Sequence, residues 1–155
     1  MEIIAIEPAQ LFVDMLSVPP DDVIDVHLNV DGNYITALGM YDVISTFTGP
    51  NTVNVHYYVS GSWLAILVLS AVEPENRFIG KRTGAFFHDT GTGGTGSYTD
   101  LKVTRDAVME IHDRVIRLTA QNYESLSEEG LVELVNRRAI YTTDDLRRLG
   151  LTVTE

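Results

Sequence analysis

Short runs of apolar, mostly β-branched residues alternate along the first half of the chain with segments whose apolar positions recur every three or four residues. The first kind predicts strands at residues 2–6, 23–30 and 53–59, and the second kind predicts helices at 9–16 and 35–47. Strands that alternate with helices in this way are typical of an α/β fold with a largely parallel sheet.

Two loops that contain proline, at residues 19–22 and 48–51, each separate a predicted helix from the strand that follows it. Neither of them resembles an interdomain linker. A chain of 155 residues can bury roughly 70% of its unfolded surface, so it needs no disulfide or metal to hold a core. We therefore expect one domain that spans residues 1–155.

The pattern changes after residue 96, where one long amphipathic helix is predicted at about residues 98–122. Its apolar stripe consists of Leu101, Val108, Ile111, Val115 and Leu118. A helix of about 24 residues is about 36 Å long, which exceeds what a domain of this size usually covers. Part of the stripe is expected to pack on another subunit; the alternative is that the whole stripe belongs to the intramolecular core.

Capping residues predict two shorter helices near the C-terminus. Ser127, which precedes two glutamates, is a favoured N-cap, and the segment from Thr142 begins a short helix that ends at Gly150. Acidic side chains close to a helix N-terminus are stabilised by the helix dipole. Both starts carry such acidic residues.

Composition narrows the range of partners. The formal net charge is −11, and a surface this acidic repels phosphate backbones and anionic lipid headgroups. Neither nucleic acid nor a membrane is therefore an expected partner. The N-terminus lacks a basic start followed by a long apolar core, so we interpret the chain as a cytoplasmic protein.

Cysteine is absent from the chain, which excludes thiol catalysis, disulfides and thiolate metal sites. The four histidines, His27, His56, His88 and His112, are far apart in the sequence and show no spacing typical of metal ligands. We expect neither a metal nor another cofactor.

Ser62 is the first candidate catalytic residue. It lies where the strand at residues 53–59 gives way, through Ser60 and Gly61, to an apolar helix that begins at Trp63. A serine in this place is a candidate nucleophile, and the amide of Trp63 is expected to point to where an oxyanion forms. The alternative is that Ser62 is only an N-cap, because serine is favoured at that position.

His88 is the candidate general base. It ends a second apolar strand, residues 84–87, which is expected to reach the same edge of the sheet as Ser62. The alternative is a solvated histidine beside the carboxylate of Asp89. The segment that ends at Asn33 contains glycine and asparagine, which tolerate positive φ, so its amides are candidates to complete an oxyanion hole.

Residues 91–96 satisfy the pattern G-x-G-x-x-G after a strand and before a helix. We do not interpret this run as a dinucleotide-binding motif, because no strand follows that ends in an acidic ribose ligand about 20 residues later. The run also lacks the lysine of a phosphate-binding loop. A loop that hydrogen-bonds an extended peptide through its backbone fits better, with a surface loop as the alternative.

These features occur in a characteristic order. The segments concerned are residues 29–33, 35–37, 41–42, 60–62, 76–78, 87–88, the glycine run with 99–100, 113–114 and 150–151. Over about residues 22–153, their order and spacing resemble those of the ClpP-type serine peptidases of the crotonase-like superfamily. A compact, divergent chain of this kind is similar to versions carried by phages.

The resemblance implies a fold and an assembly. The fold is a ClpP/crotonase-like ββα spiral with a long projecting handle helix, here at about residues 98–122. Two heptameric rings are expected to stack through this helix into a tetradecamer that encloses a catalytic chamber. The family's N-terminal pore segment has no counterpart before the first predicted strand, so an unfoldase ATPase is a doubtful partner.

The resemblance also implies roles for individual residues. Ser62 matches the nucleophile and His88 the general base, while the backbone amides of Asn33 and Trp63 match the oxyanion donors. The residues that match the substrate-binding strand are Gly91, Gly93 and Gly94.

The third member of the catalytic triad departs from the family pattern. The expected aspartate aligns with Arg138, or with Ala139 or Asn136 if a nearby gap is moved. Loss of the group that orients the histidine costs about 10⁴ in turnover in the serine-protease template. If another polar group orients His88, Asn136 and Asp89 are the first candidates.

Two further positions differ from the family. Asn33 replaces a glycine in the oxyanion segment, so it is expected to adopt the left-handed conformation that asparagine sometimes accepts. Trp63 replaces a smaller residue beside the nucleophile and is expected to narrow the acyl pocket.

The function predicted from this resemblance is that of the proteolytic subunit of an ATP-dependent-protease-type assembly. This serine endopeptidase hydrolyses extended polypeptides through acylation of Ser62, with proton transfer by His88. The first alternative is a catalytically inactive or weakly active ClpP-like structural or regulatory subunit, suggested by Arg138 and Trp63. A weaker alternative is a crotonase-like enzyme acting on a thioester, which the short chain and its acidity oppose.

Overall fold

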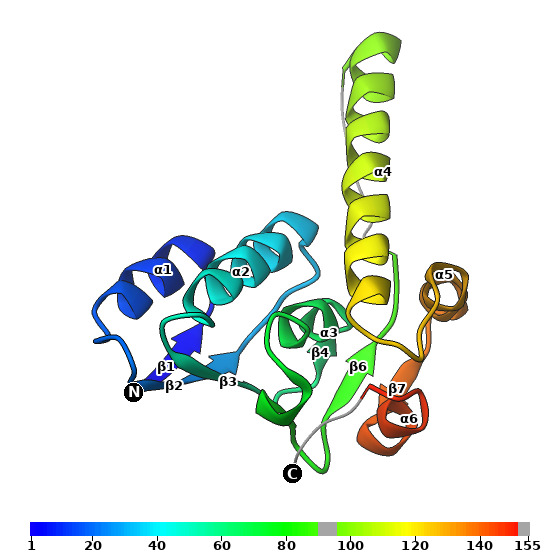
Figure 1. Cartoon of the computed structure of the whole chain (residues 1–155). Helices are drawn as coiled ribbons and strands as arrows, with labels where there is room; N and C mark the ends of the chain where they lie inside the picture. Colours follow the sequence, from blue (N-terminus) through cyan, green and yellow to red (C-terminus); the bar gives the residue numbers. More distant parts are fainter. Residues whose placement is uncertain (90–95, 152–155) are drawn as a thin grey trace.

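The structure, a computed structural model, describes residues 1–89 and 96–151. Its main sheet contains four parallel strands in the order β1-β2-β3-β5. The strands are β1 (Glu2–Ala5), β2 (Val23–Leu28), β3 (Thr52–Tyr57) and β5 (Arg77–Ile79). Helices α1 (Pro8–Leu16) and α2 (Tyr34–Phe47) connect the first three strands and lie side by side on one face of this sheet (Figure 1). The predicted α/β class is therefore confirmed.

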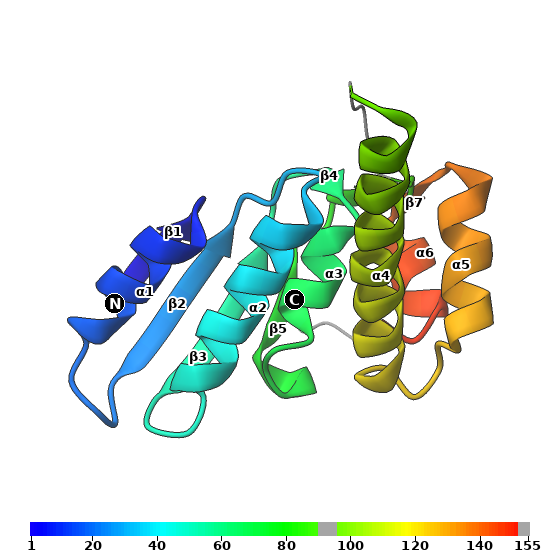
Figure 2. The same cartoon turned by 90° about the horizontal axis from the view of Figure 1, so that it is seen from above.

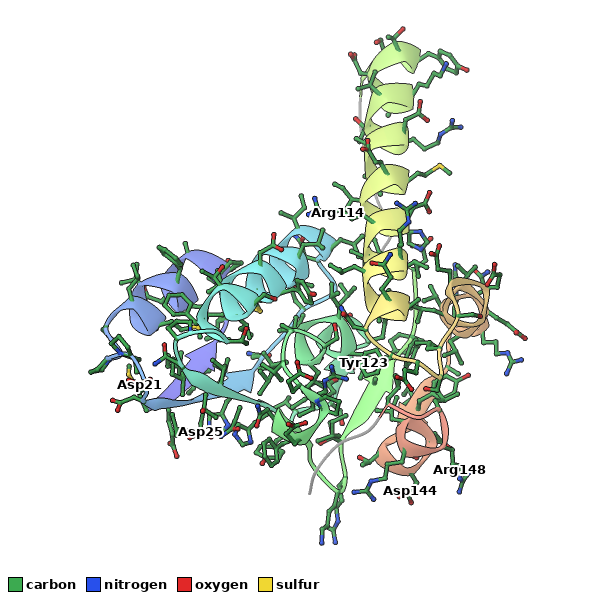
Figure 3. The ribbon with its side chains drawn as sticks, viewed as in Figure 1. Asp21, Asp25, Arg114, Tyr123, Asp144 and Arg148 are labelled. Atoms are coloured by element: carbon green, nitrogen blue, oxygen red, sulfur yellow. The ribbon has the colours of Figure 1, made fainter. Side chains whose placement is uncertain are left out.

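Alternating burial along the strands explains why this sheet has two different faces. In β2, Ile24, Val26 and Leu28 are buried, whereas the residues between them are only half-buried. Val26 lies between Ile3 of β1 and Val55 of β3, and these apolar side chains form the core under α1 and α2. Asp25 points from the opposite face, away from both helices (Figure 3).

A second, smaller sheet has the strand order β4-β6-β7. Its strands are β4 (Gly61–Ser62), β6 (Gly84–Phe86) and β7 (Ile140–Thr142). β4 and β6 are parallel, and β7 is antiparallel to β6. Helix α3 (Leu64–Leu69) follows β4 and is buried along its whole length, because its apolar residues face the core on every side. A 3-10 turn, η1 (Pro74–Asn76), precedes β5.

Helix α4 (Tyr98–Gln121) confirms the long helix predicted from the apolar stripe, and it projects from the body of the molecule (Figure 1). A capping box between Ser97 and Asp100 begins it. Val115 is buried in the C-terminal half, but Leu101, near the N-terminal end, is 42% exposed. Among the described residues, other side chains therefore bury only the C-terminal half of this apolar stripe.

Helices α5 (Glu128–Arg137) and α6 (Thr143–Arg148) pack beyond α4 and the second sheet (Figure 2). Ser127 and Thr142 cap them as predicted, since each side chain accepts a hydrogen bond from a first-turn amide. Among the described helices, none is long and apolar enough to span a bilayer.

Candidate active site

The short strand β4 carries Ser62 to the edge of the second sheet. Ser62 pairs with Phe86 of β6 in parallel register, and the Ser60 hydroxyl accepts a hydrogen bond from the Gly84 amide at 2.9 Å. Ser62 itself is 7% exposed. The candidate nucleophile is thus held beside the strand that leads to His88.

Tyr57, the last residue of β3, forms a hydrogen bond with strand β6. Its hydroxyl donates to the Gly84 carbonyl at 3.2 Å. Burial raises the pKa of Tyr57 to about 12, so the phenol keeps its proton at neutral pH and remains a donor. The main sheet and the second sheet are therefore joined close to Ser62.

The Ser62 hydroxyl accepts a hydrogen bond from the Leu64 amide at 3.3 Å. This contact resembles helix capping, so the capping interpretation of Ser62 stays open. Within residues 1–89 and 96–151, no hydrogen bond joins Ser62 to the ring of His88. In a serine peptidase such a contact often tightens only when substrate binds.

The ring of His88 is oriented by its own backbone. Its Nδ1 lies 2.9 Å from the carbonyl oxygen of Asp89, and because a carbonyl can only accept, Nδ1 carries the proton in this contact. Nε2 is then the unprotonated nitrogen, as a general base requires. A Cβ added to Gly32 would lie 3.8 Å from Nε2, so the ring faces the segment that precedes Asn33.

The amides of Asn33 and Trp63, the predicted oxyanion donors, both have acceptors in this structure. The Asn33 amide donates to Oδ1 of Asp31 at 3.0 Å, and the Trp63 amide donates to the Phe86 carbonyl at 3.1 Å. A substrate oxygen would have to replace or share these acceptors. The oxyanion role of the two amides stays a prediction.

Our prediction of a left-handed backbone at Asn33 is wrong. Its φ is −94° and its ψ is 118°. The Asn33 side chain accepts hydrogen bonds from the amides of Ile35 at 2.9 Å and Thr36 at 3.3 Å. Asn33 is therefore the N-cap of α2, and an N-cap residue takes an extended rather than a left-handed conformation.

The indole of Trp63 does not narrow a pocket beside Ser62, which corrects our expectation. Trp63 is 1% exposed and its ring stacks on Phe87, with centroids 5.8 Å apart. Its Nε1 donates to the carbonyl of His88 at 3.0 Å. The side chain turns into the core, where it contacts the backbone that carries the candidate base.

The segment aligned with the triad aspartate does lie next to the candidate base. The Phe87 amide donates to the Ala139 carbonyl at 3.0 Å, so Ala139 lies beside the residue that precedes His88. Arg138 is exposed and ends α5 with a left-handed backbone, φ 50° and ψ 45°. In the described part of the chain, no carboxylate hydrogen-bonds to the His88 ring.

The two other candidates for orienting His88 behave differently. Asn136 is exposed on α5 and forms no hydrogen bond with the His88 ring. Asp89 does reach the ring, but through its main-chain carbonyl. Its carboxylate instead accepts a hydrogen bond from the hydroxyl of Tyr34 at 3.1 Å. Sequence reasoning missed Tyr34, because a tyrosine at a helix start gives no sign of a partner 55 residues away.

The predicted substrate-binding residues Gly91, Gly93 and Gly94 lie outside the described residues. The loop therefore stays a prediction. Across residues 1–89 and 96–151, no group of three or more histidine and carboxylate side chains is arranged to hold a metal ion.

Comparison with known proteins identifies the family. A family model described as Clp protease matches residues 7–153, which is nearly the whole chain. No curated protein matches the chain. The match agrees with the resemblance inferred from the order of the segments, while the similarity to phage-type versions stays a prediction.

Proposed function

This chain belongs to the Clp protease family, and we propose that it is a serine endopeptidase that cleaves extended polypeptides inside a homo-oligomeric chamber. Its parallel sheet with covering helices is consistent with the ClpP/crotonase-like fold of that family. The observation that carries the proposal is the convergence of three distant segments. These are the loop that ends at Asn33, the strand that ends at Ser62, and the strand that leads to His88.

Two close approaches support this convergence. A Cβ added to Gly61 would lie 3.6 Å from the Val30 carbonyl, and one added to Gly32 would lie 3.5 Å from Cε1 of His88. The loop therefore approaches both the residue before the nucleophile and the ring of the base.

The reaction proceeds in two steps. Oγ of Ser62 attacks the peptide carbonyl while Nε2 of His88 takes the hydroxyl proton, and the same proton then goes to the leaving amine. Water, activated by His88, hydrolyses the resulting ester and restores Ser62. The substrate oxygen displaces Asp31 from the Asn33 amide as charge develops on it.

The proposed assembly is a pair of heptameric rings that stack through α4. Support comes from exposed apolar side chains in the projecting half of this helix, where Val103 is 64% and Met109 is 54% exposed. Apolar side chains gathered on one projecting element often mark a protein interface. Native mass spectrometry measures the oligomer directly, and a monomer at micromolar concentration would contradict the chamber.

Active-site labelling tests the chemistry. We expect a fluorophosphonate probe to label the wild type on Ser62, and Ser62→Ala to remove the label. An unstructured polypeptide should be cleaved by the wild type and not by Ser62→Ala. If the probe fails on the wild type as completely as on the variant, the peptidase proposal is wrong.

A second candidate function is an inactive or weakly active subunit of a mixed ring. The hydrogen bonds that already occupy the Asn33 and Trp63 amides favour it, as does the cation at position 138. This function predicts co-purification with an active homologue and no labelling of Ser62. A homogeneous oligomer that cleaves polypeptides would eliminate it.

A further inference from the structure

We propose that the carbonyl of Asp89 is the group that orients the candidate base His88, and that Tyr34 and Trp63 are the positioning residues that hold this carbonyl in place. The inference rests on the proposed function, because it concerns the same histidine. It assigns the task of the missing triad carboxylate to a main-chain oxygen.

The carbonyl of Asp89 alone is a weak orienting group unless its peptide is fixed. Strand β6 ends at Phe86, so His88 and Asp89 lie beyond the last residues of the ladder. A free peptide at a strand end rotates readily, and the Nδ1 hydrogen bond of 2.9 Å would then be lost. Other contacts must therefore hold this backbone.

Trp63 supplies the first of these contacts. Its Nε1 donates to the His88 carbonyl at 3.0 Å, on the residue immediately before Asp89. The indole cannot easily move, because it is 1% exposed and stacks on Phe87. A buried indole needs an acceptor for its N–H, so this contact has a stabilising role for both partners.

Tyr34 supplies the second contact. Its hydroxyl donates to Oδ1 of Asp89 at 3.1 Å, and the residue is 5% exposed. Its ring packs edge-on against Trp63, with centroids 6.5 Å apart, and against His112 of α4 at 5.7 Å. The two contacts therefore come from one aromatic cluster, which holds the carbonyl of the residue before Asp89 and the side chain of Asp89 itself.

A neutral carbonyl and a carboxylate perform different parts of the orienting task. Both accept from Nδ1–H and so keep Nε2 unprotonated. Only a carboxylate adds a charge that stabilises the imidazolium formed during the reaction. The proposed arrangement therefore positions His88 without that additional stabilisation, and it explains how the base is held with Arg138 in the usual aspartate position.

Two measurements on Tyr34→Phe test the inference. In protein labelled with ¹⁵N-histidine, NMR reports which ring nitrogen of His88 carries the proton. We expect Nδ1–H in the wild type and a mixture of tautomers in Tyr34→Phe. The fluorophosphonate labelling rate should fall about tenfold in this variant, as expected for the loss of one hydrogen bond to a charged group.

Tyr41→Phe is the matched control. Tyr41 lies on the same helix, and its hydroxyl accepts a hydrogen bond from Asn122 at 3.2 Å, away from His88. Both readouts should remain at the wild-type value. Asp89→Ala should reproduce the effect of Tyr34→Phe, and the double variant should be no worse than either single variant, because the two residues act through one contact.

The outcomes separate this inference from the proposed function. An Nε2–H tautomer in the wild type, or an unchanged tautomer in Tyr34→Phe, would overturn the role of Tyr34. If no protein is labelled but the tautomer shifts as expected, the positioning holds and the peptidase proposal fails. Trp63→Phe provides a second variant, and thermal denaturation checks that each protein is folded.

Discussion

Two histidines of this protein, His56 and His88, differ in how many partners their rings have. Both nitrogens of His56 have side-chain partners: Nε2 lies 3.0 Å from Oδ1 of Asp25, and Nδ1 lies 3.0 Å from the Tyr58 hydroxyl. The His56 ring is also stacked between His27 and Phe78, with centroids 4.8 and 4.7 Å away. By its partners alone, His56 resembles a catalytic histidine more than His88 does.

Among residues 1–89 and 96–151, the ring nitrogens of His88 have one hydrogen-bond partner, the Asp89 carbonyl. Its Nε2 faces Gly32 and is left to accept a proton. A base must have such an unused acceptor next to space for substrate, whereas a histidine with both nitrogens engaged holds structure together. An incomplete set of hydrogen-bond partners on the ring, rather than a full set, therefore marks the candidate base.

Replacement of each histidine by glutamine should produce the largest difference in fluorophosphonate labelling rate. We expect His88→Gln to lower the fluorophosphonate labelling rate at least about 10³-fold, because removal of a triad member has effects of this size. His56→Gln should remain within about twofold of wild type, since a change remote from the reacting atoms leaves transition-state stabilisation intact. Equal losses in the two variants would remove the distinction between these histidines.

A carboxylate beside His88 would give it the kind of partner that His56 has. Arg138→Asp should raise the labelling rate about tenfold, because a charge-assisted hydrogen bond is roughly twice as strong as a neutral one. Arg138→Asn has a similar shape without the charge and should show no such gain. If Arg138→Asp also shows no gain, the carboxylate does not reach the ring.

The contact between His56 and Asp25 should affect stability rather than the labelling rate. Hydrogen bonds from Asn54 and His56 hold the pKa of Asp25 below its usual range. A depressed folded-state pKa stabilises the fold above the unfolded value of about 3.9, and this contribution is lost as pH falls through the folded pKa.

We therefore expect Asp25→Asn to lower the free energy of unfolding by about 0.5–1 kcal/mol at pH 7, a modest value because the carboxylate is partly exposed. Below about pH 3 the difference should shrink, because Asp25 is then increasingly protonated in both states. Urea denaturation at the two pH values measures it. Asp42→Asn, on an exposed position of α2, serves as the control, and a pH-independent difference would contradict the assignment.

The smallest expected effect concerns the backbone at the C-terminal end of α5. Arg138 has φ 50°, a conformation that costs an L-residue about 1 kcal/mol and glycine very little. Arg138→Gly should therefore raise the melting temperature by roughly 1–4 °C. Arg137→Gly, inside the last turn of α5, should lower it. A lower melting temperature in both variants would mean that the side chain of Arg138 contributes more than its backbone costs.

Much of the fold was predictable because its signals are local. Helix α4 follows from the spacing of Val115 and Leu118 with the other apolar residues of its stripe, and α5 follows from Ser127 at its start. Strands β5 and β7 were not predicted. Each has three residues, and a segment this short has no measurable periodicity, so its pairing partners decide its conformation.

The candidate site was predictable only in outline. Ser62 and His88 were identified from the predicted strands at 53–59 and 84–87. These two strands lie in different sheets, and it is the short strand β4, which contains Ser62, that pairs in parallel with β6. The expectation that Trp63 narrows the acyl pocket did not anticipate its burial, because a side chain beside a nucleophile can face either the pocket or the core. Here the His88 carbonyl and the Phe87 ring decided the outcome.

The amino-acid sequence by itself determined the succession of strands and helices, the caps, and the identity of the alcohol and the imidazole, since each depends on neighbours along the chain. Only the tertiary structure decided which oxygen orients His88, which amides are already occupied, and which residues hold them. Those contacts join segments distant in sequence, as with Tyr34 and Asp89. Main-chain groups are chemically identical at every position, so only the folded arrangement distinguishes the carbonyl of Asp89 from all others.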